Sequence, residues 1–98
     1  MSLYSLATHR LYLENVRRQE AEAERVQALV EKKFYEIMSC YVKNVKFMGI
    51  THNEQLTIFI DNRERYARKI TKSSHTKFQV AYKAYNMVIS VLETSQSS

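Results

Sequence analysis

The chain has little of what builds turns, crosslinks and phosphate loops. Its 98 residues include no proline, no tryptophan, one glycine and one cysteine, Cys40. A single cysteine excludes an intramolecular disulfide, which small secreted domains commonly need. A single glycine excludes a glycine-rich loop that cradles phosphates. Disulfide-stapled secreted domains and nucleotide-binding loop proteins are therefore excluded as classes.

Long apolar runs are also missing. No stretch approaches the roughly 20 apolar residues that a membrane span requires. Residues 1–13 carry His9 and Arg10 within their apolar pattern and lack the small-residue cleavage site of a signal peptide. We therefore expect an intracellular protein in a reducing compartment, cytoplasmic by default, with no membrane partner.

Metal-ligating residues are few and scattered. His9, His52 and His75 lie far apart in the sequence, with Cys40 between the first two, and none has the spacing of a metal site. We assign no metal, no cofactor and no catalytic residue.

What is present is ordinary globular composition. Hydrophobic residues make up 45% of the chain and charged residues 26%, a balance typical of a folded domain. The length suits one core, so we expect a single domain over residues 1–93. Residues 94–98 are small and polar, which predicts a disordered tail.

The first half of the chain predicts a helix over residues 5–43. Its main apolar stripe recurs at spacings of three and four, and its members are Val26, Val30, Phe34, Ile37 and Tyr41. A weaker apolar group precedes it, consisting of Leu6, Leu13 and Val16. Between the two groups, residues 17–25 hold no large apolar side chain. The pattern predicts either one long helix that projects from the domain or two helices that meet near Arg18.

From Val45 onward the apolar period changes from about 3.6 to 2. Residues 45–50 and 56–60 alternate in polarity around the turn-like residues 51–54, which predicts a β-hairpin. Residues 62–71 are ambiguous, since Asp61 and Glu64 also match a capping box that would start a short helix. We favour a third strand, which would place Tyr66 beside Ile58 on the buried face.

The last segment predicts a helix capped by Ser73 or Ser74. Its apolar stripe consists of Phe78, Ala81, Tyr85, Val88 and Leu92. The expected fold class is α+β, in which a three-stranded antiparallel meander is packed on one side by the two helices.

The net charge of +5 lies in one segment, Arg63 to Lys77. This segment contains six basic residues and one acidic residue, whereas the rest of the chain holds nine basic and nine acidic residues. The candidate binding residues are Arg63, Arg65, Arg68, Lys69, Lys72 and Lys77, with Tyr66 interleaved for stacking on an unpaired base. The alternative, without any binding function, is a solvated strand whose charges prevent aggregation between sheets.

The predicted function is therefore a small non-enzymatic binding protein of regulatory or accessory type. RNA or DNA is the favoured partner, and an acidic protein surface is the second candidate. The alternative is a protein-protein adaptor or inhibitor that acts through the long N-terminal helix, which could also form a homodimer. A third hypothesis is a metal-independent ribonuclease, with His75 as general acid or base beside Arg65, Arg68 and Tyr66.

Overall fold

Three helices form the regular structure of the chain in the computed structural model, which describes the backbone of residues 3–96 and the side chains of residues 8–95. The helices are α1 (Leu3–Phe47), α2 (His52–Lys72) and α3 (Thr76–Gln96). Residues 3–96 contain no strand. The predicted α+β fold with its three-stranded meander is therefore wrong, and the described chain is all-α.

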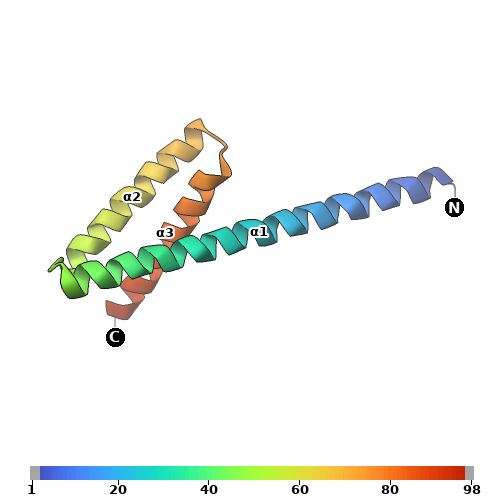
Figure 1. The fold of residues 1–98 in the computed structure, drawn as a ribbon. Coiled ribbons are helices and arrows are strands. Elements are labelled where there is room, and N and C mark those ends of the chain that lie inside the picture. The colour runs from blue at the N-terminus through green and yellow to red at the C-terminus, as the bar shows by residue number, and fades with distance from the viewer. Residues whose placement is uncertain (1–2, 97–98) are drawn as a thin grey trace.

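The shape is a helical hairpin attached to one end of a long helix. α2 and α3 run antiparallel and pack against the C-terminal half of α1, while the N-terminal half extends away from them (Figure 1). The molecule measures 69 × 30 × 22 Å, and its radius of gyration is 19.4 Å. A compact domain of this length would have a radius near 13 Å. We call the described side chains of residues 8–25 the arm and the rest of the molecule the body.

α1 is continuous through Arg18, so the first of the two sequence predictions for this region, one long projecting helix, is confirmed. Within the arm every residue is exposed except the half-buried Val16. The core begins at Val26, which packs at the edge of the buried cluster.

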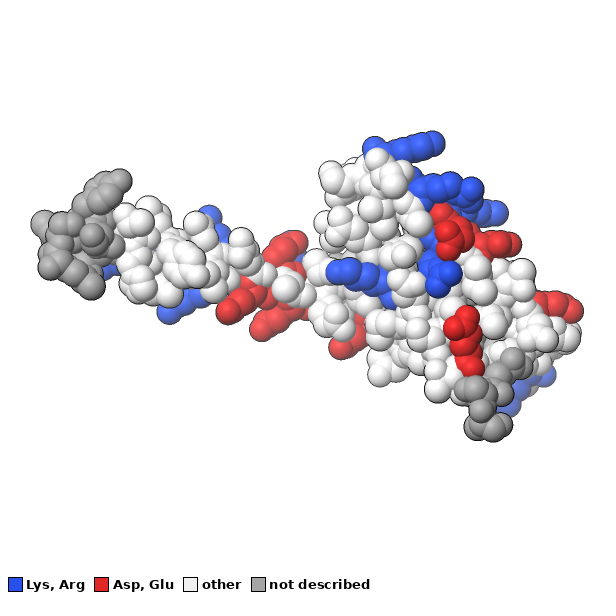
Figure 2. All heavy atoms as spheres, turned by 180° about the vertical axis from the view of Figure 1, so that it is seen from behind, with Lys and Arg blue, Asp and Glu red and all other residues white. Residues whose placement is uncertain are grey.

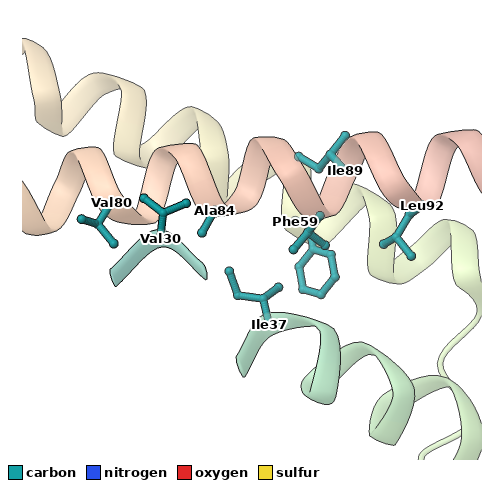
Figure 3. Close-up of a cluster of buried hydrophobic side chains, with 8 residues drawn as sticks. Val30, Ile37, Phe59, Val80, Ala84, Ile89 and Leu92 are labelled. Carbon is teal, nitrogen blue, oxygen red and sulfur yellow. The ribbon is translucent and has the colours of Figure 1, made fainter. Parts of the chain in front are cut away.

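The core is built around α3. Buried side chains of α3 pack against Val30 and Ile37 of α1 and against Phe59 of α2, and Figure 3 shows these side chains converging from the three helices. The members from α3 are Val80, Ala84, Val88, Ile89 and Leu92. α3 contacts both other helices extensively, whereas α1 and α2 touch much less. The predicted apolar stripes of the first and last helices supply half of this cluster, namely Val30, Ile37, Val88 and Leu92.

The first predicted strand, residues 45–50, is instead the end of α1 and the connection, and the second and third predicted strands, residues 56–60 and 62–71, lie within α2. Phe59 is 4% exposed and Ile58 is 45% exposed, the reverse of the predicted strand pattern. On a helix, Leu56, Phe59 and Ile60 share one face, and all three pack in or against the core. Ile58 points to solvent and has no contact with Tyr66 of the kind that the strand model required.

Two local signals separate α1 from α2. Gly49 has φ +71°, the left-handed conformation that ends helices, and the N–H groups of Met48 and Ile50 both donate to the Asn44 carbonyl. Thr51 then caps α2, since its side chain accepts a hydrogen bond from the Glu54 N–H at 3.1 Å. The connection between the helices is therefore residues 48–51, and the residues predicted to form a hairpin turn, 51–54, are the cap and first turn of α2.

Two hydrogen bonds between polar side chains cross this connection. The hydroxyl of Tyr41 lies 2.7 Å from Nδ1 of His52, and Nδ2 of Asn44 donates to Oε1 of Gln55 at 2.6 Å. Gln55 is only 2% exposed, so its amide depends on this partner. These bonds join the last turns of α1 to the first turn of α2.

α3 includes residues 94–96, which the sequence analysis assigned to a tail. Residues 97–98 of that tail lie outside the described part of the chain. No helix that the structure describes is both long enough and apolar enough to cross a membrane.

Candidate nucleic-acid interface

The C-terminal half of α2 presents four cations on one face. Arg65, Arg68, Lys69 and Lys72 follow one another at the i, i+3, i+4 and i+7 spacing of a single helical face. All four are exposed, and the face covers about 10 Å along the helix. Lys69 and Lys72 also lie in the last turn of α2, where cations are favourable beside the carbonyl ends. Part of this charge therefore stabilises the helix as well as marking a surface.

A stack of aromatic rings joins the end of α2 to the start of α3. The ring of Tyr66 stacks on that of Tyr85 at 5.8 Å, with 22° between the planes, and lies 6.2 Å from Phe78. The Lys69 ammonium lies 5.1 Å from the Tyr66 centroid and 5.5 Å from that of Phe78. The Lys77 ammonium lies 5.3 Å from the Phe78 centroid. Cation–π attraction thus holds the cations of two helices close together.

Lys77 is in an unfavourable place for its own helix. It lies in the first turn of α3, which contains no acidic residue. The exposed N–H groups there already make the N-terminus positive, so a cation adds to the local potential rather than offsetting it. An anionic group at the start of α3 would be attracted both by the Lys77 ammonium and by the N–H groups of the helix N-terminus.

The hollow between the three helices, which we call the basic hollow, has a volume of about 580 Å³. Four lysines line it, Lys32 and Lys33 from α1, Lys69 from α2 and Lys77 from α3, against one acid, Glu36. Glu36 is paired with Lys33 at 3.9 Å. The apolar part of the lining comes from Leu29, Tyr66, Phe78, Val80 and Ala81.

Two of the predicted binding residues are engaged inside the body. Arg63 donates to Oδ1 of Asn86 at 3.2 Å and pairs with Glu64 at 3.3 Å. Tyr66 is half-buried in the aromatic stack, with Lys69 over its ring. Arg65, Arg68, Lys69, Lys72 and Lys77 remain exposed. We therefore define the basic cluster as these five residues together with Lys32 and Lys33.

The two signs of charge are unevenly distributed over the molecule. Figure 2 shows Lys and Arg side chains gathered on the body toward the α2–α3 end, and Asp and Glu side chains gathered on the arm close to the body. The acids of the arm there are Glu20, Glu22 and Glu24. The basic cluster and the acidic part of the arm thus form distinct surfaces.

Other candidates for chemistry lie apart from one another. His75 is exposed on the α2–α3 connection, with its ring at the edge of Phe78. Cys40 is an exposed free thiol of α1. Among the described residues, no three or more His, Cys, Asp and Glu side chains gather as a metal site would need.

The sequence did not indicate Lys32 and Lys33 as candidate binding residues. They lie in the middle of α1, about 30 positions before the basic segment, in a stretch where acidic and basic residues alternate. Only the packing of α1 against the α2–α3 hairpin brings them to Lys69 and Lys77. Their placement beside the apolar stripe gives no signal of this meeting.

Comparison with models of known families, with curated proteins and with solved structures finds no match for this chain.

Proposed function

We propose that the chain is a non-enzymatic accessory protein that binds RNA or DNA through the basic cluster. One observation carries the proposal: cations from all three helices converge on one end of the body, where α3 also begins. Phosphates of a nucleic-acid backbone are the anions that such an array suits, because charge contacts of this kind need no fixed base sequence. A reducing, cytoplasmic location fits the lone thiol, and we include it in the proposal.

The apolar lining of the basic hollow favours one other partner class. Leu29, Val80 and Phe78 could receive apolar side chains of an acidic protein segment, while the surrounding lysines pair with its carboxylates. Such a complex would bury apolar surface, so it would depend less steeply on salt than phosphate binding does.

The test is a titration of labelled single-stranded and duplex nucleic acid followed by fluorescence anisotropy at several salt concentrations. The logarithm of affinity should fall linearly with the logarithm of salt, with a slope of about 0.7 to 0.9 for each phosphate contacted. The double variant Arg65→Glu with Lys69→Glu should bind more weakly, with a salt slope lower by about two.

A matched control is available at the other end of the body. Lys43 and Lys46 are also exposed helix cations, and Lys46, like Lys69, lies in a last helical turn. Changing either pair to glutamate lowers the net charge by four, from +5 to +1. If the control weakens binding as much as Arg65→Glu with Lys69→Glu does, net charge and not the basic cluster accounts for the affinity.

The same samples test the ribonuclease hypothesis. RNA incubated with the protein should remain full-length on a denaturing gel. If the wild-type chain shortens RNA and His75→Ala does not, the protein is an enzyme, since losing a general acid or base costs about 10²- to 10⁴-fold in rate.

A further inference from the structure

We infer that the arm is a dimerisation element and that it binds the arm of a second copy in antiparallel orientation. The proposal does not depend on the basic cluster. It rests on the exposed apolar side chains of the arm, on a hollow at its base, and on the order of its charges.

The arm exposes large apolar side chains that nothing in the described chain covers. Leu13 is 42% exposed and Tyr12 is 64% exposed, and Val16 adjoins Leu13 on the same face of α1. Leu11 is also exposed, but it is two positions from Leu13 and so points about 200° away around the helix. One face of the arm is therefore suited to a partner helix.

The receiving surface lies where the arm joins the body. A shallow hollow of about 670 Å³ is lined by Ala23 and Val26 of α1 and by Gln79 and Lys83 of α3, among others. Ala23 is five positions after Arg18, and Leu13 is five positions before it. A two-fold axis near Arg18 would therefore set Leu13 of one copy on Ala23 of the other, with Tyr12 reaching Val26. The small side chain of Ala23 leaves room for this contact.

The charges of the arm favour the antiparallel orientation. Before Gln19 the arm carries Arg10, Arg17 and Arg18 against one acid, and after it come three acids, Glu20, Glu22 and Glu24, against Arg25, which pairs with Glu22. On the flank of the apolar face, the antiparallel pair places Arg10 beside Glu24 of the second copy and Arg17 beside Glu20. A parallel pair would instead lay this flank beside the opposite flank of the second copy, so neither of these two pairings would form.

The first test is the mass in solution, measured by sedimentation equilibrium over a wide range of protein concentration. The wild-type chain should approach twice the 11.6 kDa of one copy. Leu13→Asp should weaken the dimer at least about a hundredfold, because each of the two copies loses a buried leucine. Leu11→Asp is the matched control, with the same change on the opposite face of the same turn, and it should remain dimeric.

The second test distinguishes the orientation by disulfide crosslinking in a Cys40→Ser background. Gln19→Cys lies beside the two-fold axis and should crosslink two copies under mild oxidation. His9→Cys should not, because the antiparallel pair holds the two positions about 27 Å apart along the helices, far beyond the reach of a disulfide.

A wild-type chain that stays monomeric at every concentration overturns the proposal. So does a dimer that Leu13→Asp and Leu11→Asp affect equally. Crosslinking through His9→Cys, with or without crosslinking through Gln19→Cys, would show a parallel pair and would overturn the antiparallel assignment. None of these outcomes bears on nucleic-acid binding, which the Arg65 and Lys69 variants test separately.

Discussion

Replacement of Phe59 by alanine tests the helical assignment of α2 most directly. The side chain is 4% exposed and lies among core residues of all three helices, with its ring 5.9 Å from that of Tyr85. Truncation of a buried phenylalanine removes its transfer free energy and leaves a cavity, at a cost of about 3–5 kcal/mol. A domain of this size has about 5–15 kcal/mol in total, so Phe59→Ala should remove a large part of the stability.

Ile58→Ala is the neighbouring control. Ile58 is exposed and alanine is the better helix former, so this change should cost less than about 1 kcal/mol. Urea unfolding followed by circular dichroism at fixed protein concentration measures both. With an m-value of about 2 kcal/mol/M, Phe59→Ala should lower the midpoint by about 2 M and Ile58→Ala by under about 0.5 M.

The refuting result is a cost at Ile58 equal to or larger than that at Phe59, as a strand with Ile58 on its buried face would require. If Phe59→Ala is too unstable to measure, Phe59→Leu retains part of the buried volume and should still cost more than Ile58→Ala. The order of the two positions, and not the absolute loss, decides between helix and strand.

Two further predictions concern buried polar groups. Asn44→Ala should cost about 1–3 kcal/mol in a urea melt, because it leaves the buried Gln55 amide without its partner, whereas the exposed Lys43→Ala should change stability by less than about 0.5 kcal/mol; equal effects would contradict the buried bond. Burial of Tyr85, with Tyr66 nearby, raises the pKa of its hydroxyl above the usual value of about 10. The unfolded chain then loses this proton more readily than the folded one, so the stability that Tyr85 contributes is complete below about pH 10 and is lost as pH rises toward the folded pKa. Unfolding free energies measured across this range should fall less steeply in Tyr85→Phe, and an unchanged slope would contradict the assignment.

α1 and α3 were predictable from the sequence because the apolar residues of each recur at the helical period alone. Val26, Val30 and Ile37 recur at helical spacing with no proline or glycine between them, and α3 repeats the pattern. For α1 the long uninterrupted run gave the projecting helix as one of two alternatives, since residues 17–25 could not be buried, but it did not exclude a break near Arg18.

The strand prediction for the middle of the chain was wrong because short apolar runs fit both the helical and the strand period. Residues 56–60 are rich in β-branched and aromatic side chains, and β-propensity reflects the surroundings more than the backbone. The deciding signals were local. Gly49 marks the end of a helix. Thr51 followed three residues later by Glu54 matches a capping box, and the apolar helical stripe begins two positions after it, at Leu56.

The position of net charge was read correctly from the sequence, but its geometry was not. The segment from Arg63 to Lys77 was singled out, whereas the engagement of Arg63 by Asn86 depends on how α2 packs on α3. The arrival of Lys32 and Lys33 at the same hollow depends on α1 as well. Contacts between residues far apart in the sequence cannot be predicted from the spacing of residues along it.

The continuity of α1 has a consequence for how the arm holds its helical form. Starting a helix is unfavourable, because several residues must be ordered before the first hydrogen bond forms, whereas adding residues to an existing helix costs little. Here the first turns are supplied by residues 26–47 in the body, so the arm only propagates a helix that already exists. In the monomer its helicity should decay from the body toward the N-terminus as a fraying end. Amide hydrogen exchange along α1, measured at concentrations where the chain is monomeric, should rise gradually in that direction instead of changing abruptly at one residue.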